Sequence, residues 1–126
     1  METTKFGENL NLPGYHGGRV FTTRKVHPMR VDLLTREYPP FIYGGAGVHV
    51  AELSKVLADH ADVHVHAFDG ARDETVVEGV TVNGYDYLEG LEGNDAIKTF
   101  GVDLQMVEGV DGADLVHSHT WYANMA

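Results

Sequence analysis

Hydrophobic residues form short runs that alternate with amphipathic stretches from Met29 onward. Compact apolar runs at 29–34, 63–68 and 114–118 are bounded by turn-forming residues, and each predicts a strand. Between the first two runs, apolar residues recur at helical spacing after the glycines at 44–47. This spacing predicts a helix that ends near residues 59–60.

A second helix is predicted after Asn94-Asp95, whose side chains can cap a helix start. Its apolar positions follow a 3-4-3 spacing and predict the buried face, which comprises Ile97, Phe100, Leu104 and Val107. Ahead of it, residues 76–87 alternate around Asn83-Gly84. Since Asn-Gly favours a two-residue turn, the alternation predicts a hairpin centred there.

Strands that alternate with helices predict an α/β fold with a doubly wound, Rossmann-like parallel sheet over residues 29–126. The glycine- and proline-rich residues 1–28 predict an irregular arm. A further helix is expected to begin at Tyr122, and with so little sequence after it we expect a partial domain. In the predicted strand order, the first strand lies between the second strand and residues 114–118.

Composition narrows the function classes. The 126 residues contain no cysteine, which excludes disulfide scaffolds and thiolate chemistry. No apolar run approaches the roughly 20 residues of a membrane helix, and no secretory signal is visible, so we expect a cytoplasmic protein without a membrane partner. The net charge is −10, with seventeen of nineteen acidic residues after position 30, which argues against nucleic-acid binding.

Glycines at the start of the first predicted helix are the first candidate site. Gly44, Gly45 and Gly47 would let a ligand approach the backbone, where free N–H groups favour phosphate. A plain turn that needs glycine is an equal alternative. A dinucleotide site is a weaker one, because the third glycine of its fingerprint is missing even though Asp69 follows the second strand.

Histidine after the third strand is the second candidate. Ligands of doubly wound sheets bind at the carboxyl ends of the strands, so His119 and the glycine loop are expected to face one crevice. We expect a structural role for His117. Zinc is conceivable because His64 and His66 also alternate on a strand, but no further ligand stands at a motif-like spacing, and we expect no metal.

The loop after the first strand supplies further candidates for sugar or phosphate contact. Arg36 and Glu37 are two of them, and a surface ion pair between them is as good an explanation. Tyr43 and Trp121 are candidates for acceptor or sugar contacts, although packing is the simpler role for Trp121.

These landmarks resemble a known family. Residues 35–50, TREYPPFIYGGAGVHV, look like the N-terminal glycine loop of bacterial glycogen and starch synthases, which are retaining glycosyltransferases with two Rossmann domains (GT-B). Residues 114–122, DLVHSHTWY, look like that family's second landmark. The resemblance covers about residues 29–126 and implies an incomplete N-terminal half of the GT-B architecture.

The resemblance implies transfer of glucose from ADP-glucose or UDP-glucose to an α-1,4-glucan, with no cofactor or metal. It places Gly44, Gly45 and Gly47 near the donor phosphates and His119, as the catalytic histidine, by the transferred sugar. The lysine common before the family's glycines is replaced by Ile42-Tyr43, so Arg36 is the candidate for that phosphate contact.

In the family the nucleotide lies mainly in a second Rossmann domain. We therefore expect this chain to need such a domain, in cis or in trans, and to be inactive by itself. The alternatives are a non-catalytic module that binds glucan or a partner, and, more remotely, an NAD-binding domain.

Overall fold

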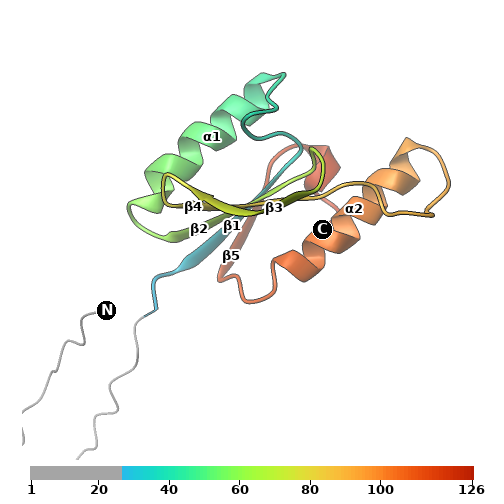
Figure 1. The fold of residues 1–126 in the computed structure, drawn as a ribbon. Helices are drawn as coiled ribbons and strands as arrows, with labels where there is room; N and C mark the ends of the chain where they lie inside the picture. Colours follow the sequence, from blue (N-terminus) through green and yellow to red (C-terminus); the bar gives the residue numbers. More distant parts are fainter. Residues whose placement is uncertain (1–26) are drawn as a thin grey trace, which may run out of the picture.

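A computed structural model describes residues 27–126, and almost all of the predicted arm at 1–28 lies outside them. Its five strands form one sheet in the order β3-β4-β2-β1-β5 (Figure 1). The described elements are β1 (Arg30–Thr35), α1 (Gly45–Ala58), β2 (Asp62–Ala67), β3 (Arg72–Val77), β4 (Val80–Gly84), α2 (Asp95–Gly109), β5 (Leu115–Ser118) and a 3₁₀ turn, η1 (Trp121–Ala123).

The predicted α/β fold is confirmed, including the placement of β1 between β2 and β5. Four strands run parallel, whereas β3 pairs antiparallel with β4 at one edge, so the sheet is mixed rather than wholly parallel. Successive residues of β1 face opposite sides of the sheet. Leu33 packs in the core beneath α1 and Leu34 in the core beneath α2, and the two helices cover opposite faces (Figure 1).

The predicted hairpin exists, but its turn was placed wrongly. The chain reverses at Glu78-Gly79, both with positive φ, rather than at Asn83-Gly84. Asn83 and Gly84 instead continue β4 and pair with the end of β2. This register buries Val80 and Val82 beneath α1, and that burial outweighs the local turn preference of Asn-Gly.

The predicted face of α2 was also wrong. Asn94 caps the helix through its side chain, as predicted, but the 3-4-3 stripe from Ile97 to Val107 is 42–49% exposed. The buried side chains are Thr99, Val102, Asp103 and Met106. Two of these four are polar, so a search for apolar spacing selects the neighbouring stripe.

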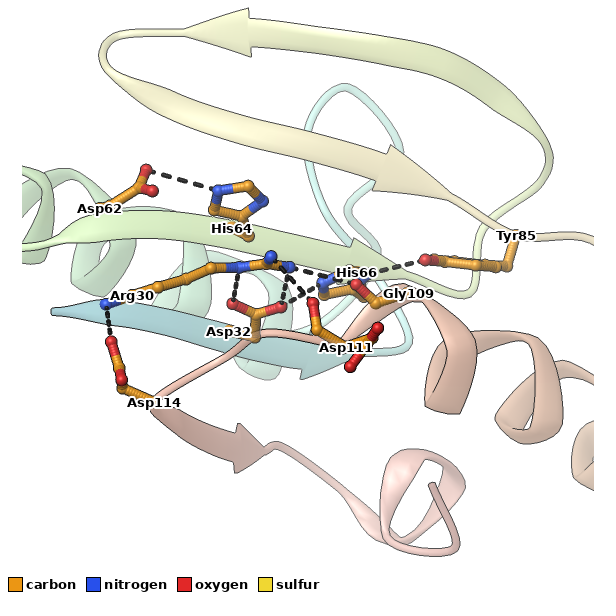
Figure 2. A network of polar contacts seen from close by, with 9 residues as sticks. All are labelled: Arg30, Asp32, Asp62, His64, His66, Tyr85, Gly109, Asp111 and Asp114. Carbon is orange, nitrogen blue, oxygen red and sulfur yellow. Dashed lines mark hydrogen bonds and ion pairs between the residues drawn. The ribbon is translucent and has the colours of Figure 1, made fainter. Parts of the chain in front are cut away.

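A buried polar network fastens α2 to the sheet (Figure 2). Asp32 in β1 is fully buried and receives two hydrogen bonds from the Arg30 guanidinium, of 2.8 and 2.7 Å. Arg30 also donates to the carbonyls of Gly109 and Asp111. It thereby supplies a cation at the carboxyl end of a helix that has no basic residue in its last turn.

His66 completes the network from β2. Its Nε2 lies 2.9 Å from Asp32 and its Nδ1 2.7 Å from the Tyr85 hydroxyl. Since a carboxylate only accepts, Nε2–H donates to Asp32 and Nδ1 accepts from Tyr85. Burial lowers the pKa of His66 despite the neighbouring carboxylate, so the ring is neutral near pH 7.

Neither α1 nor α2, the two α-helices among the described residues, has the length and apolarity to cross a membrane.

The corrected face of α2 predicts different consequences for two neighbouring substitutions. Met106→Ala removes a fully buried side chain and should lower the free energy of unfolding by about 2–5 kcal/mol. Leu104→Ala removes one that is 49% exposed and should change it by less than about 1 kcal/mol. Urea denaturation measures both, and a larger loss for Leu104→Ala would contradict the observed face.

Asp103 provides a pH-dependent prediction. It is 1% exposed, neither carboxylate oxygen has a hydrogen-bond partner in residues 27–126, and burial raises its pKa from 3.8 to about 6. Above pH 6 the folded chain must bury a charge that the unfolded chain leaves in water. Asp103→Asn should therefore stabilise the protein at pH 8, and its advantage should shrink as the pH falls through 6.

Thermal unfolding between pH 4 and pH 8 measures this, with Glu92→Gln, at an exposed position, as the control. Equal pH profiles for Asp103→Asn and the unmodified chain would contradict the assignment.

Candidate functional site

The candidate residues gather where β1 and β5 end, at the carboxyl edge of the sheet. The backbone N–H of His119 donates to the Leu34 carbonyl at 2.7 Å, which holds the segment after β5 against the end of β1. The ring of His119 lies 5.4 Å from that of His49 in α1. The structure therefore brings His119 beside the helix that the glycines open.

Glu37 organises the loop between β1 and α1. Its side chain is buried, and its Oε2 accepts the backbone N–H groups of Tyr43 and Gly44 at 2.7 and 2.8 Å. Thr35 fixes the backbone of Glu37 through its hydroxyl. A carboxylate at the start of α1 is favoured by the helix dipole. Glu37 thus serves an internal role, and its predicted contact with a sugar stays a prediction.

The three glycines have different surroundings. A Cβ on Gly44 would lie 3.1 Å from Glu37 Oε1, and one on Gly47 would lie 2.8 Å from Glu37 Cγ. A Cβ on Gly45 would meet nothing within 4 Å. The packing of Glu37 therefore explains two of the glycines. None of the three has the positive φ for which a plain turn would need glycine. Gly45 alone offers open backbone to a ligand.

His119 is suited to form a hydrogen bond with an uncharged ligand group. Its Nε2 is buried without a hydrogen-bond partner among residues 27–126. Burial, with the neighbouring His117 and His49, lowers its pKa. A neutral imidazole can donate or accept one hydrogen bond at this atom. His117 stacks on His119 with ring centroids 4.3 Å apart and is exposed rather than enclosed in the fold.

Arg36 and the two aromatic candidates lie near the same edge. The Arg36 guanidinium lies over the rings of Phe68 and Tyr122, and its Nε donates to the Tyr43 hydroxyl at 2.9 Å. Tyr43 is 74% exposed. Trp121 is 62% exposed and stacks on Tyr122, so the packing role expected for it is only partial.

Sequence reasoning missed three side chains that this arrangement uses. His49 stands one helical turn after Gly45, and the spacing from a helix start is the signal that could have found it. The positions of Phe68 and Tyr122 around Arg36 depend on the strand order and carry no local signal.

The acidic residue of the dinucleotide alternative is engaged through one oxygen, whereas its buried Oδ1 has no hydrogen-bond partner among the described residues. Asp69 pairs with Arg72 and accepts the backbone N–H of Tyr38 at 3.3 Å, so its Oδ2 is committed within the protein. A cavity of about 220 Å³ lies between α1 and the β3–β4 hairpin, and His119 is not among the residues that line it.

The histidines considered for zinc do not assemble. His66 is bound within the Asp32 network, and His64 lies 3.4 Å from Asp62 (Figure 2). The part of the chain that the structure describes holds no group of three or more His, Asp or Glu side chains that could bind a metal ion.

Known proteins share much of this sequence. The chain is 44% identical over 100 residues to the α-maltose-1-phosphate synthase of Mycolicibacterium smegmatis, and 44% identical over 98 residues to that of Mycobacterium tuberculosis. The chain is similar to one part of a glycosyltransferase. Each alignment covers 78% of this chain and 24% of the synthase, so the chain spans about a quarter of these curated relatives. No protein-family model matches it.

The contrast between the glycines yields a matched pair of variants. Gly47→Ala forces the Glu37 side chain to move and should lower the free energy of unfolding by about 1–3 kcal/mol. Gly45→Ala enters open space and should leave it within about 0.5 kcal/mol of the original. Chemical denaturation measures both, and Gly47→Ala combined with Glu37→Ala should relieve the clash. Equal effects of the two single substitutions would contradict the role given to Glu37.

Proposed function

We propose that residues 29–126 form the acceptor-side part of a retaining glycosyltransferase of the GT-B architecture, which transfers glucose from ADP-glucose or UDP-glucose. The observation that carries this proposal is the 44% identity to synthases named for α-maltose 1-phosphate. Its geometric support is the partnerless Nε2 of a neutral His119 beside α1, at the strand edge where doubly wound sheets bind ligands.

The acceptor we favour is glucose 1-phosphate. A synthase that makes α-maltose 1-phosphate joins two glucose units, one of which carries phosphate on its anomeric carbon. Elongation of an α-1,4-glucan is the second candidate, and the resemblance of residues 35–50 to glycogen and starch synthases favours it.

The proposed transfer gives His119 and Gly45 separate roles. The bond from the glucose anomeric carbon to the donor phosphate breaks, a bond to the oxygen of an acceptor hydroxyl forms, and the proton of that hydroxyl passes to the leaving diphosphate. Negative charge grows on the leaving diphosphate, which needs preorganised donors around it. His119 hydrogen-bonds the transferred sugar through Nε2, and the open backbone at Gly45 approaches the donor. The remaining phosphate contacts come from a second Rossmann domain, in cis or in trans.

The exposed apolar surface of β5 supports the need for a further domain. Leu115 and Val116 on the edge strand β5 are 52% and 44% exposed. A stand-alone binding module would be expected to cover such positions. The lack of cysteine accords with the cytoplasmic location that we also propose.

A chimera tests this function. The aligned segment of this chain replaces that of the Mycolicibacterium smegmatis synthase, and α-maltose 1-phosphate is measured by ³¹P NMR with each donor and glucose 1-phosphate. We expect product from the chimera and none from the 126-residue chain alone. Extension of glycogen without this product would favour the second acceptor, and transfer by the isolated chain would contradict the need for a second domain.

In the same chimera, His119→Ala should lower turnover by about two orders of magnitude or more, as loss of one preorganised donor does, and change the donor KM less. His60→Ala, an exposed histidine at the far end of α1, is the matched control. Unchanged turnover in His119→Ala would leave this histidine a structural role only.

A further inference from the structure

The guanidinium of Arg36 makes three contacts with neighbouring side chains. The rings of Phe68, which follows β2, and Tyr122, in η1, lie 4.9 and 4.4 Å from its guanidinium carbon. The third contact is the bond from its Nε to the Tyr43 hydroxyl. Contacts with two rings and a hydrogen bond at Nε restrict the movement of the guanidinium, so less conformational freedom remains to be lost on binding.

The same arginine lacks an acidic partner. Among the arginines that the structure describes, Arg30 pairs with Asp32 and Arg72 with Asp69, whereas Arg36 makes no ion pair. Its two terminal nitrogens also have no hydrogen-bond partner in residues 27–126. Within residues 27–126, a preorganised guanidinium thus has no carboxylate partner, although the net charge of the chain is −10.

The orientation of the Glu37 carboxylate explains why Arg36 has no acidic partner among the described residues. Glu37 follows Arg36 directly, yet its carboxylate turns toward the N–H groups of Tyr43 and Gly44. The alternative of a surface ion pair between Arg36 and Glu37 is therefore wrong. Glu37 holds Tyr43, and Tyr43 in turn holds Arg36, so the acidic neighbour orients the guanidinium without neutralising it.

We propose that Arg36 is the receptor for the phosphate group of a sugar phosphate, which it binds through its two terminal nitrogens. The parallel N–H groups of a guanidinium match two oxygens of a phosphate, and an arginine fixed in place binds it better than a mobile one. This inference rests on the proposed function, in which it makes Arg36 the residue that distinguishes phosphorylated glucose from the end of a glucan.

Binding to the 126-residue chain tests the inference without any transfer reaction. Glucose 1-phosphate, inorganic phosphate, glucose and ADP are each titrated at low ionic strength and followed by two-dimensional NMR. We expect saturable binding of glucose 1-phosphate and phosphate, none of glucose, and the largest shifts at residues around Tyr43 and Tyr122. Arg36→Gln should weaken phosphate binding about tenfold or more, as loss of a charge-assisted pair of hydrogen bonds does.

Arg36→Lys keeps the charge but loses the flat stack and the paired donors, and should weaken binding nearly as much. Lys55→Gln, which removes a cation paired with Glu78 on the other side of α1, should change nothing. Unfolding curves confirm that each variant is folded, and if Arg36→Gln does not fold, Arg36→Lys decides.

Phosphate binding that survives Arg36→Lys, or no saturable phosphate binding at all, would overturn the proposal. Tighter binding of ADP than of glucose 1-phosphate through Arg36 would also overturn it, because the residue would then serve a diphosphate. Failure of the chimera to make α-maltose 1-phosphate would leave the binding result intact, so the two failures are distinguishable.

Discussion

The buried carboxylate of Asp32 is the constraint around which the described fold is arranged. Burying a charge is costly unless it is paired and hydrogen-bonded, and Asp32 obtains its partners from Arg30 in its own strand and His66 in β2. Arg30 extends the arrangement to the end of α2. The position of β1, from which the candidate site begins, therefore depends on three elements at once.

A second buried carboxylate, that of Glu37, lies just after the end of β1 and also needs hydrogen-bond partners. Glu37 is buried and satisfies its charge with backbone N–H groups instead of a cation. That choice shapes the loop, requires small residues at two positions of the glycine cluster, and leaves Arg36 free of its acidic neighbour. Asp32 thus joins the layers of the fold, whereas Glu37 shapes the loop at the candidate site.

Features that depend on local sequence were predictable. The strands β1, β2 and β5, the two helices and the Asn94 cap follow from spacing and from residue chemistry within a few positions, and the order β2-β1-β5 follows from the general topology of alternating α/β chains. The antiparallel edge strand β3 did not follow, since a parallel sheet was expected. The face of α2 and the hairpin turn were not predictable, because distant partners decide them. The glycine loop and the segment that contains His119 could be found in the sequence. Which glycines pack against Glu37 and which one stays open could not, since spacing does not reveal where the Glu37 side chain points.

The aromatic side chains around Arg36 show why such a site requires the whole sheet edge. Phe68 follows β2, Arg36 follows β1 and Tyr122 follows β5, and these three strands are neighbours in the order β2-β1-β5. A parallel arrangement brings all three segments out at the same edge, so Tyr122 can contact the guanidinium of Arg36, which lies 86 positions earlier in the sequence. Strand order, rather than any local motif, is what places a cation with fixed orientation next to His119 and the start of α1.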